Sequence, residues 1–196
     1  ENRLTVVDPD FDHELRCLMA DTLTTGFGII NRDAGVKLGE SVVVVGAGGI
    51  GSGAVLGAYL AGANPIIAVD IHAHKLDHAK RLGATHTIDS SIKDFETSVR
   101  DILTGGGGDV VIDGTGNPSI IESCYRLTDS KGRTILFGVP HHTNTINIHS
   151  LPLHFGRSIL GSEGGQSIPH EDIHKYYNLI IQRKVDLSGM VTHRGN

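Results

Sequence analysis

The feature of this sequence that most constrains its fold is an apolar run that ends directly in a glycine-rich turn. Residues 42–45 are four consecutive valines, and residues 46–51 read Gly-Ala-Gly-Gly-Ile-Gly, a G-x-G-x-x-G pattern. A run that is apolar at every position is typical of a strand covered on both faces, as in a parallel sheet. Small residues at helical spacing follow the glycines. The order of strand, glycine turn and helix predicts the start of a βαβ unit, with residues 41–45 as the central strand.

Each glycine of this pattern has a physical role in such a turn. Gly46 would allow the chain to turn tightly, Gly48 would let the backbone approach a pyrophosphate, and Gly51 would let the helix pack closely on the strand. The free N–H groups and the helix dipole would then face the phosphates. Similar glycine turns occur in other α/β proteins, S-adenosylmethionine enzymes among them, so the turn alone does not identify a dinucleotide site.

An acidic residue stands where a dinucleotide site needs one. The next apolar run, residues 65–69, ends at Asp70, 19 residues after Gly51. A carboxylate at this position can accept hydrogen bonds from both hydroxyls of an adenosine ribose, whereas a 2′-phosphate would meet a like charge. Lys75 could reach the same ribose, although a single lysine is equally well explained as an exposed helix charge. The spacing therefore predicts NAD(H) and not NADP(H).

Short β-branched runs alternate with helix-length segments along the chain, which indicates repeated βαβ units. We predict an α/β fold of the Rossmann type, a doubly wound parallel sheet with helices on both faces. Residues 1–34 are expected to form a connecting strand and helices, and residues 35–196 the nucleotide-binding domain. The expected strands are residues 4–7, 41–45, 65–69, 85–88, 109–112, 134–137 and 158–160, and the expected helices are residues 12–33 in two pieces, 49–61, 74–82, 92–103, 118–127 and 171–183.

Charge and length narrow the classes of partner. The chain of 196 residues is long enough for one sizeable core, and its net charge of −5 argues against nucleic acid or an anionic membrane as the main partner. Glycines interrupt the apolar stretch over residues 41–69, so no membrane-spanning segment is expected. Two cysteines, Cys17 and Cys124, do not suggest a disulfide framework. We expect a soluble, cytoplasmic protein.

The N-terminus agrees with this expectation. Glu1, Asn2 and Arg3 are polar, no signal peptide follows them, and no initiator Met precedes them. We therefore expect the chain to be a piece of a longer protein.

A rival motif occurs near the C-terminus. Residues 170–174 read His-Glu-Asp-Ile-His and fit H-E-x-x-H, the zinc motif of metallopeptidases. The buried positions of the expected helix are Ile173, Tyr177 and Ile180, so both histidines and the glutamate would face solvent or the helix end. No third ligand is evident. The other histidines, His78 among them, are expected on the surface.

With these motifs in place, the chain resembles the medium-chain dehydrogenase/reductase superfamily in its zinc alcohol dehydrogenase branch. The match depends on the order and spacing of several short motifs and extends over almost the whole chain. They are residues 21–26, 36–40, 46–51, 70–71, 82–85, 109–113, 138–139 and 192–194.

The resemblance implies roles for individual residues. Thr25 would border the nicotinamide and Ile50 would pack on its face, whereas Ile71 would flank the adenine. The chain near Thr115, Phe137 and Val139 would also line the cofactor. The predicted cofactor-binding residues are Thr25, Gly46, Gly48, Gly49, Ile50, Gly51, Asp70, Ile71, Lys75, Thr115, Phe137 and Val139.

The resemblance also implies a catalytic zinc in the intact enzyme, with a ligand five positions before Gly26. That position is Asp21, where Cys is the usual residue of the family. Cys17 is the alternative, but the register favours Asp21, and Cys17 is expected to be a packed thiol. The family's remaining zinc ligands belong to a catalytic domain that precedes this segment, and they are missing here. One carboxylate does not define a catalytic zinc site, which needs three protein ligands.

These considerations predict the NAD(H)-binding domain of a zinc alcohol dehydrogenase, which transfers hydride between an alcohol and NAD. The chain alone is expected to bind the cofactor without turnover. The alternative is a non-catalytic module for NAD binding and oligomerisation. The alcohol or carbonyl substrate stays open, because fold analogy does not choose it. The resemblance further implies a homodimer that pairs the edge strand at residues 158–161.

Overall fold

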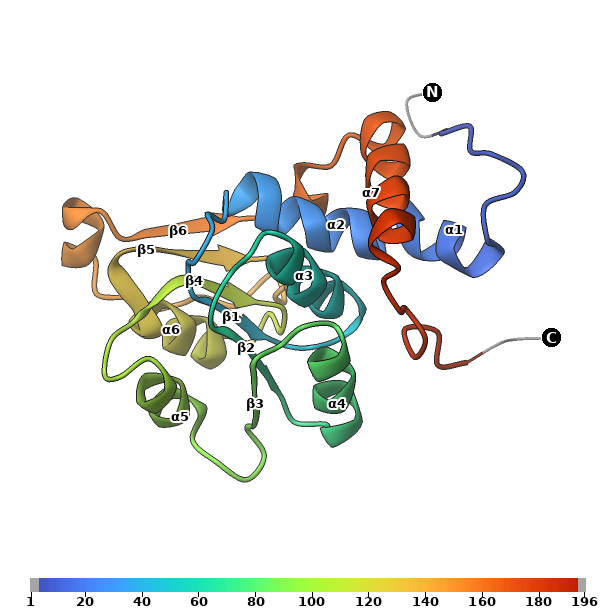
Figure 1. The fold of residues 1–196 in the computed structure, drawn as a ribbon. Helices are drawn as coiled ribbons and strands as arrows, with labels where there is room; N and C mark the ends of the chain where they lie inside the picture. The colour runs from blue at the N-terminus through green and yellow to red at the C-terminus, as the bar shows by residue number, and fades with distance from the viewer. Residues whose placement is uncertain (1–3, 194–196) are drawn as a thin grey trace.

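A sheet of six parallel strands organises the molecule (Figure 1). The strands lie side by side in the order β3-β2-β1-β4-β5-β6, which is the strand order of a Rossmann fold. The computed structural model describes residues 4–193, so Glu1, Asn2, Arg3 and Arg194 lie outside the described residues. The predicted fold class is confirmed. The strands are β1 (Val42–Val45), β2 (Ile66–Asp70), β3 (His86–Asp89), β4 (Gly108–Asp113), β5 (Thr128–Leu136) and β6 (Ser158–Gly161).

Helices cover both faces of this sheet. On one face lie α3 (Gly49–Leu60) and α4 (Ala73–Arg81), and on the other α5 (Phe95–Ile102) and α6 (Pro118–Leu127) (Figure 1). The N-terminal helices α1 (His13–Ala20) and α2 (Thr22–Gly28), a π-helix (Ile29–Asp33) and the C-terminal α7 (Pro169–Arg183) join the layer of α3. Two short 3-10 helices, Leu151–Phe155 and Gly164–Gln166, flank β6. No helix within residues 4–193 is both long and apolar enough to cross a membrane.

The valines of β1 explain why the sheet is buried on both faces. Successive side chains of a strand point to opposite faces. Val42 and Val44 accordingly belong to the core beneath α3, whereas Val43 and Val45 belong to the core beneath α5 and α6. All four are buried. The continuous apolar run therefore fills two cores at once and fixes β1 at the centre of the sheet.

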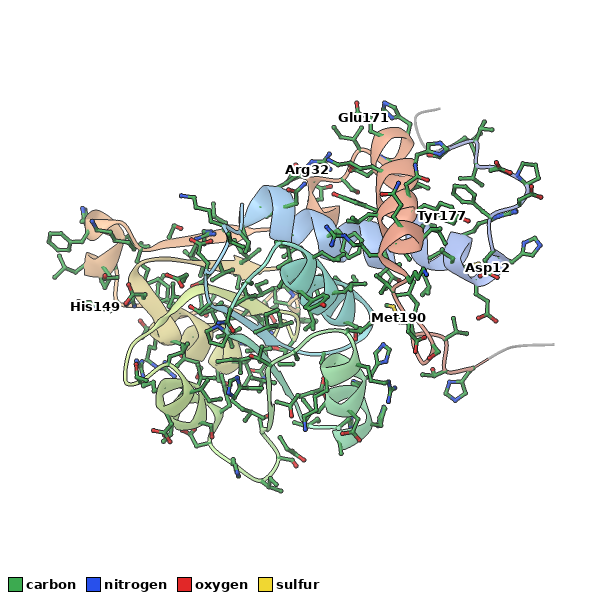
Figure 2. All side chains as sticks on the ribbon, viewed as in Figure 1. Asp12, Arg32, His149, Glu171, Tyr177 and Met190 are labelled. Carbon is green, nitrogen blue, oxygen red and sulfur yellow. The ribbon has the colours of Figure 1, made fainter. Side chains whose placement is uncertain are left out.

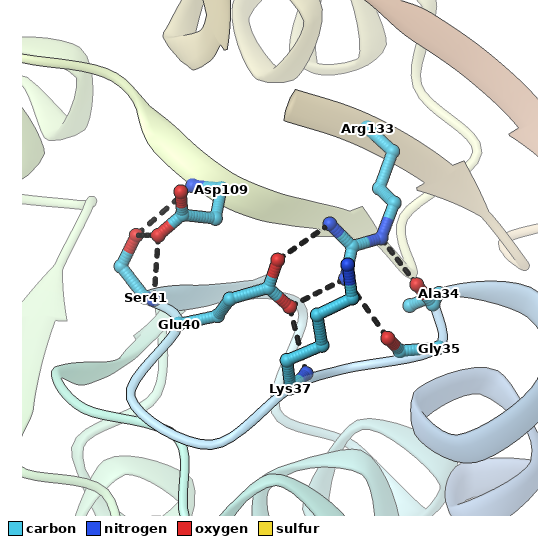
Figure 3. A network of polar contacts seen from close by, with 7 residues as sticks. All are labelled: Ala34, Gly35, Lys37, Glu40, Ser41, Asp109 and Arg133. Carbon is cyan, nitrogen blue, oxygen red and sulfur yellow. Dashed lines mark hydrogen bonds and ion pairs between the residues drawn. The ribbon is translucent and has the colours of Figure 1, made fainter. Parts of the chain in front are cut away.

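An arginine on β5 fixes the segment that leads into β1 (Figure 3). The guanidinium of Arg133 donates to both carboxylate oxygens of Glu40, at 3.1 and 2.6 Å, and to the carbonyls of Ala34 and Gly35. The Arg133 hydrogen bonds hold the pKa of Glu40 below its usual value. This network ties the chain after the N-terminal helices to the sheet. The division at residues 34 and 35 stays a prediction.

The N- and C-terminal helices meet through a partly buried ion pair. Arg32 lies in the π-helix (Figure 2). It forms a two-pronged ion pair with Asp172 near the start of α7. Asp172 is 1% exposed and also accepts the N–H of Ile168 at 2.6 Å. The ring of Tyr176 packs edge-on against Phe27 of α2. Segments far apart in the sequence thus form one layer beside α3.

The structure corrects one predicted strand. Residues 4–7 form no strand, and Leu4 and Val6 are 86% and 89% exposed. A strand needs a partner for its N–H and C=O groups, and no strand of the described chain pairs with this segment.

Three side-chain predictions are also wrong. Cys17 is exposed and not packed. His78 is buried, because α4 turns it toward the C-terminal segment near Gly189. On α7 the fully buried tyrosine is Tyr176, whereas Tyr177 is half-buried and stacks on Phe11.

Candidate cofactor-binding site

A cavity of about 720 Å³ opens at the carboxyl ends of the strands. Residues at or just after the ends of β1 to β5 contribute to its wall, and so do the first residues of α2. The chain leaves β1 toward α3 on one face and leaves β4 toward α6 on the other. Between such strands the crevice is open, and this is the place where sheets of this topology bind ligands.

The glycine turn forms one side of the cavity. Gly46 has a φ of +98°, a conformation that other residues rarely adopt. A Cβ at Gly51 would lie 1.9 Å from the carbonyl oxygen of Gly46, so the close approach of α3 to the turn requires glycine there. These two glycines are therefore explained by the fold alone.

Gly48 is different, because nothing in the protein requires a glycine at this position. Its φ is −69°, which any residue can adopt, and an added Cβ would meet no atom within 4 Å. Gly48 lines the cavity directly before α3, whose first N–H groups have no side-chain cap. The missing side chain leaves space for a group outside the protein, next to free N–H donors that favour an anion.

Asp70 lies at the end of β2 and is 8% exposed. Its Oδ2 accepts the N–H of Ala47 at 2.9 Å, and its Oδ1 accepts the N–H of His72 at 3.0 Å. The Nζ of Lys75 lies 3.8 Å from Oδ2. Each carboxylate oxygen keeps a further lone pair for a ligand. Asp70 thus shapes the glycine turn and also offers acceptors to the cavity.

Most of the predicted cofactor residues meet in this cavity. Ten of the twelve line it, namely Gly46, Gly48, Gly49, Ile50, Gly51, Asp70, Ile71, Lys75, Thr115 and Phe137. Thr25 is buried in α2 outside the wall, and its hydroxyl donates to Asp21 at 2.8 Å. Val139 is 91% exposed beyond β5.

The cavity also contains residues that the sequence did not single out. Ser90 follows β3 directly, and Asn117 caps α6 by accepting the N–H of Ser119. Phe95 and Ile120 come from the helices of the other face. A position just after a strand end could have suggested Ser90. Phe95 and Ile120 carry no such signal, because they look like ordinary core positions of α5 and α6.

The described residues do not form a complete metal site. Asp21 directly precedes α2, is exposed and lines the cavity wall, so it is one possible ligand. Within residues 4–193 no three His, Cys, Asp or Glu side chains lie together in a way that could hold a metal ion. A catalytic zinc with three protein ligands therefore does not fit the residues present.

The H-E-x-x-H pattern is likewise no metal site. Glu171 lies at the outer end of α7 (Figure 2) and is exposed, as is His170. His174 packs against the ring of Phe11.

Comparison with known proteins agrees with this geometry. Residues 49–182 match a family model described as zinc-binding dehydrogenase. A probable S-(hydroxymethyl)glutathione dehydrogenase 1 of Schizosaccharomyces pombe is 40% identical over 151 residues, which cover 76% of this chain and 40% of that protein. Alcohol dehydrogenase 2 of Oryza sativa subsp. japonica is 29% identical over 194 residues, covering 97% of this chain and 51% of that protein.

A solved structure shows the same fold. Benzyl alcohol dehydrogenase from Acinetobacter calcoaceticus superimposes with a TM-score of 0.86 and 32% identity, over 92% of this chain and 50% of that protein. The chain spans about half the length, or less, of the curated relatives it matches.

Proposed function

The chain belongs to the family of zinc-binding dehydrogenases, and from this premise we propose that it holds NAD(H) for an enzyme that transfers hydride between an alcohol and NAD. The observation that carries the proposal is the space above Gly48 in a cavity that also contains the carboxylate of Asp70. The space above Gly48 suits the pyrophosphate of an adenine dinucleotide, and the carboxylate of Asp70 suits the hydroxyls of its ribose.

Different residues of the cavity bind different parts of the cofactor. The N–H groups at the start of α3 bind the pyrophosphate, and the helix dipole adds to that attraction. Asp70 accepts the ribose hydroxyls, and Lys75 stands beside it. The apolar side chains of Ile71, Phe95 and Ile120 supply surface for a flat base. Thr25 and Ile50 stay assigned to the nicotinamide end, and the chain near Val139 to the cofactor in general.

The carboxylate of Asp70 also sets the choice of cofactor. A 2′-phosphate would bring a second negative charge to a carboxylate that is almost fully buried. Lys75 partly offsets this repulsion, at 3.8 Å. We therefore propose a preference for NAD(H) over NADP(H).

Binding measurements test the proposal. NADH and NADPH are titrated separately into the purified chain, with quenching of NADH fluorescence or calorimetry as the readout. NADH is expected to bind more tightly than NADPH. Equal affinities, or no binding of either cofactor, would contradict the proposed role of Asp70 or of the cavity.

Zinc, when bound, supplies the Lewis acid that polarises the alcohol oxygen in this class of enzyme. Asp21 is the single candidate ligand that we assign in this chain, so we propose that the chain alone holds no stoichiometric catalytic zinc and does not turn over alcohol. A metal assay that finds one zinc per chain, lost in Asp21→Ala, would contradict this.

The second candidate is a module that binds NAD(H) but catalyses no reaction. It is favoured by the observation that no three metal-ligating side chains lie together within residues 4–193. The two candidates differ in the intact protein. The first predicts alcohol oxidation there with NAD and zinc, whereas the second predicts binding of NAD(H) without product.

We also propose self-association through the outer edge of β6. This strand is the last of the sheet, and its far side pairs with no strand of the described chain. Leu160 is 45% exposed on it, and the adjacent 3-10 helix presents Phe155, which is 69% exposed. An unpaired apolar edge favours pairing with a second copy. Sedimentation that shows only monomer at high concentration would refute the dimer.

We also propose a cytoplasmic location. Cys17 and Cys124 are free thiols, and free thiols are expected in a reducing compartment.

A further inference from the structure

A second cavity, of about 370 Å³, lies at the opposite end of α6 from the cofactor cavity. The two cavities share no wall residue. Three arginines from three different segments meet here: Arg100 from the last turn of α5, Arg126 from the last turn of α6, and Arg157 just before β6. His149 lies in the same wall, at the far end of the molecule from α7 (Figure 2).

Two of the three arginines in this cavity have no carboxylate partner among the described residues. Arg126 forms an ion pair with Glu96, whereas no ion pair of Arg100 or Arg157 exists within residues 4–193. Arg100 Nη2 donates to the carbonyl of Arg126 at 2.8 Å, and Arg157 Nη1 donates to the carbonyl of Tyr125 at 3.1 Å. These carbonyls belong to consecutive residues at the end of α6, and both arginines line the same cavity.

The guanidinium of Arg157 is also fixed in orientation. Its Nε donates to the carbonyl of Asp129 at 3.3 Å, and its central carbon lies 5.1 Å from the ring centroid of Tyr125. That tyrosine is 2% exposed, and its hydroxyl donates to the carbonyl of His149 at 2.9 Å. Arg157 is therefore positioned against a buried ring.

These bonds leave most of the donors unused. A guanidinium carries five N–H groups, and the protein occupies a minority of them on Arg100 and on Arg157. The carbonyls at the end of α6 carry a partial negative charge of about half a unit, which does not balance two full positive charges. The carboxylate of Glu122 also lines the cavity, and its Oε1 accepts the N–H of Asn147 at 2.7 Å. Its single negative charge and the helix end together still leave the two guanidinium charges in slight excess.

We propose that this cavity is a binding site for a small phosphate-bearing molecule, held between Arg100 and Arg157. Two guanidinium groups in the wall of one cavity, each with free N–H donors, match the oxygens of a phosphate, which arginine binds in a two-pronged manner. Charge capping of α6 explains one hydrogen bond of each arginine, but not the cavity or the remaining donors. Glu122 would lie near the bound anion and repel it.

Inorganic phosphate is the probe that tests the site. The chain is labelled with ¹⁵N, and phosphate or sodium chloride is added at matched ionic strength while the side-chain Nε–H signals of Arg100 and Arg157 are followed. These signals report this cavity, so phosphate bound at the glycine turn does not confuse the result. Phosphate is expected to shift both signals with saturation, and chloride is expected to leave them almost unchanged.

Three variants make the test specific. Arg100→Gln is expected to weaken phosphate binding about tenfold, which corresponds to about 1.4 kcal/mol, while Glu122→Gln tightens it. Arg183→Gln, at an exposed arginine of α7, is the matched control and changes nothing. Arg100 makes a single bond to the protein, so its variant keeps the test valid if Arg157→Gln does not fold. Equal shifts with chloride, or the same affinity in the Arg100 and Arg183 variants, would overturn the proposal.

Discussion

Replacing Gly48 with Ala separates binding from folding at the glycine turn. The added methyl group meets no protein atom within 4 Å, and the φ of −69° suits alanine. Loss of backbone freedom in the unfolded chain would stabilise the variant by about 0.4–1 kcal/mol. Alanine is a poorer residue than glycine before a helix, which costs about 0.5–1 kcal/mol. The two terms nearly cancel, and the melting temperature is expected to move by no more than about 4 °C.

Binding is expected to respond quite differently. The methyl group would occupy the space where the pyrophosphate approaches the N–H groups of α3. Loss of one such charge-assisted hydrogen bond costs about 1.5–3 kcal/mol, and each 1.4 kcal/mol is a factor of about ten in the dissociation constant. The variant should therefore bind NADH about ten to a hundred times more weakly than the wild type.

Gly51→Ala is the matched control, because it adds the same methyl group one turn away. Its Cβ would lie 1.9 Å from the carbonyl oxygen of Gly46, so this variant is expected to lose stability as well as affinity. Calorimetric titration with NADH and thermal unfolding by circular dichroism measure both properties. If Gly48→Ala is folded and binds NADH as tightly as the wild type, the space above Gly48 is not the pyrophosphate site.

Three further changes have expected outcomes. Asp70→Asn keeps one acceptor for the two N–H groups it bonds, so NADH affinity should fall about tenfold while NADPH affinity holds or rises; a parallel loss of both in calorimetry would speak against a ribose contact. Glu40→Gln should lower the free energy of unfolding by about 1–2 kcal/mol at neutral pH, because it loses the charged bonds to Arg133. Since the pKa of Glu40 is lowered from 4.5 in the fold, this difference should shrink as the pH falls below 4.5; urea titrations that show a constant difference would refute it. Burial lowers the pKa of His78 from 6.5, so wild-type stability should fall as the pH decreases below 6.5, and His78→Gln should lack that part of the fall in the same titrations.

The sequence predicted the sheet and the glycine turn because both depend on local patterns. A strand of four valines suits a position that is buried on both faces of a sheet. Gly46 and Gly51 are required by steric contacts between residues only five positions apart. Asp70 was placed at the cavity for the same reason, as the end of the next strand.

Features that depend on distant segments could not be predicted in this way. His78 is buried because a segment more than a hundred residues later covers it near Gly189. Residues 4–7 have a strand-like pattern but no neighbouring edge to pair with. Phe95 entered the cavity wall only because the other helix layer reaches the same sheet edge.

The central claim, that NAD(H) binds at the carboxyl edge of the sheet, is tested most directly by mapping the bound cofactor. NADH is titrated into ¹⁵N-labelled chain, and the shift of every assigned backbone amide is measured. We predict the largest shifts at residues 46–51, at residues 70–75 and near Thr115, with little change around Arg100 and Arg157. Shifts confined to any other surface, or no saturable shifts at all, would contradict the assignment of the cavity.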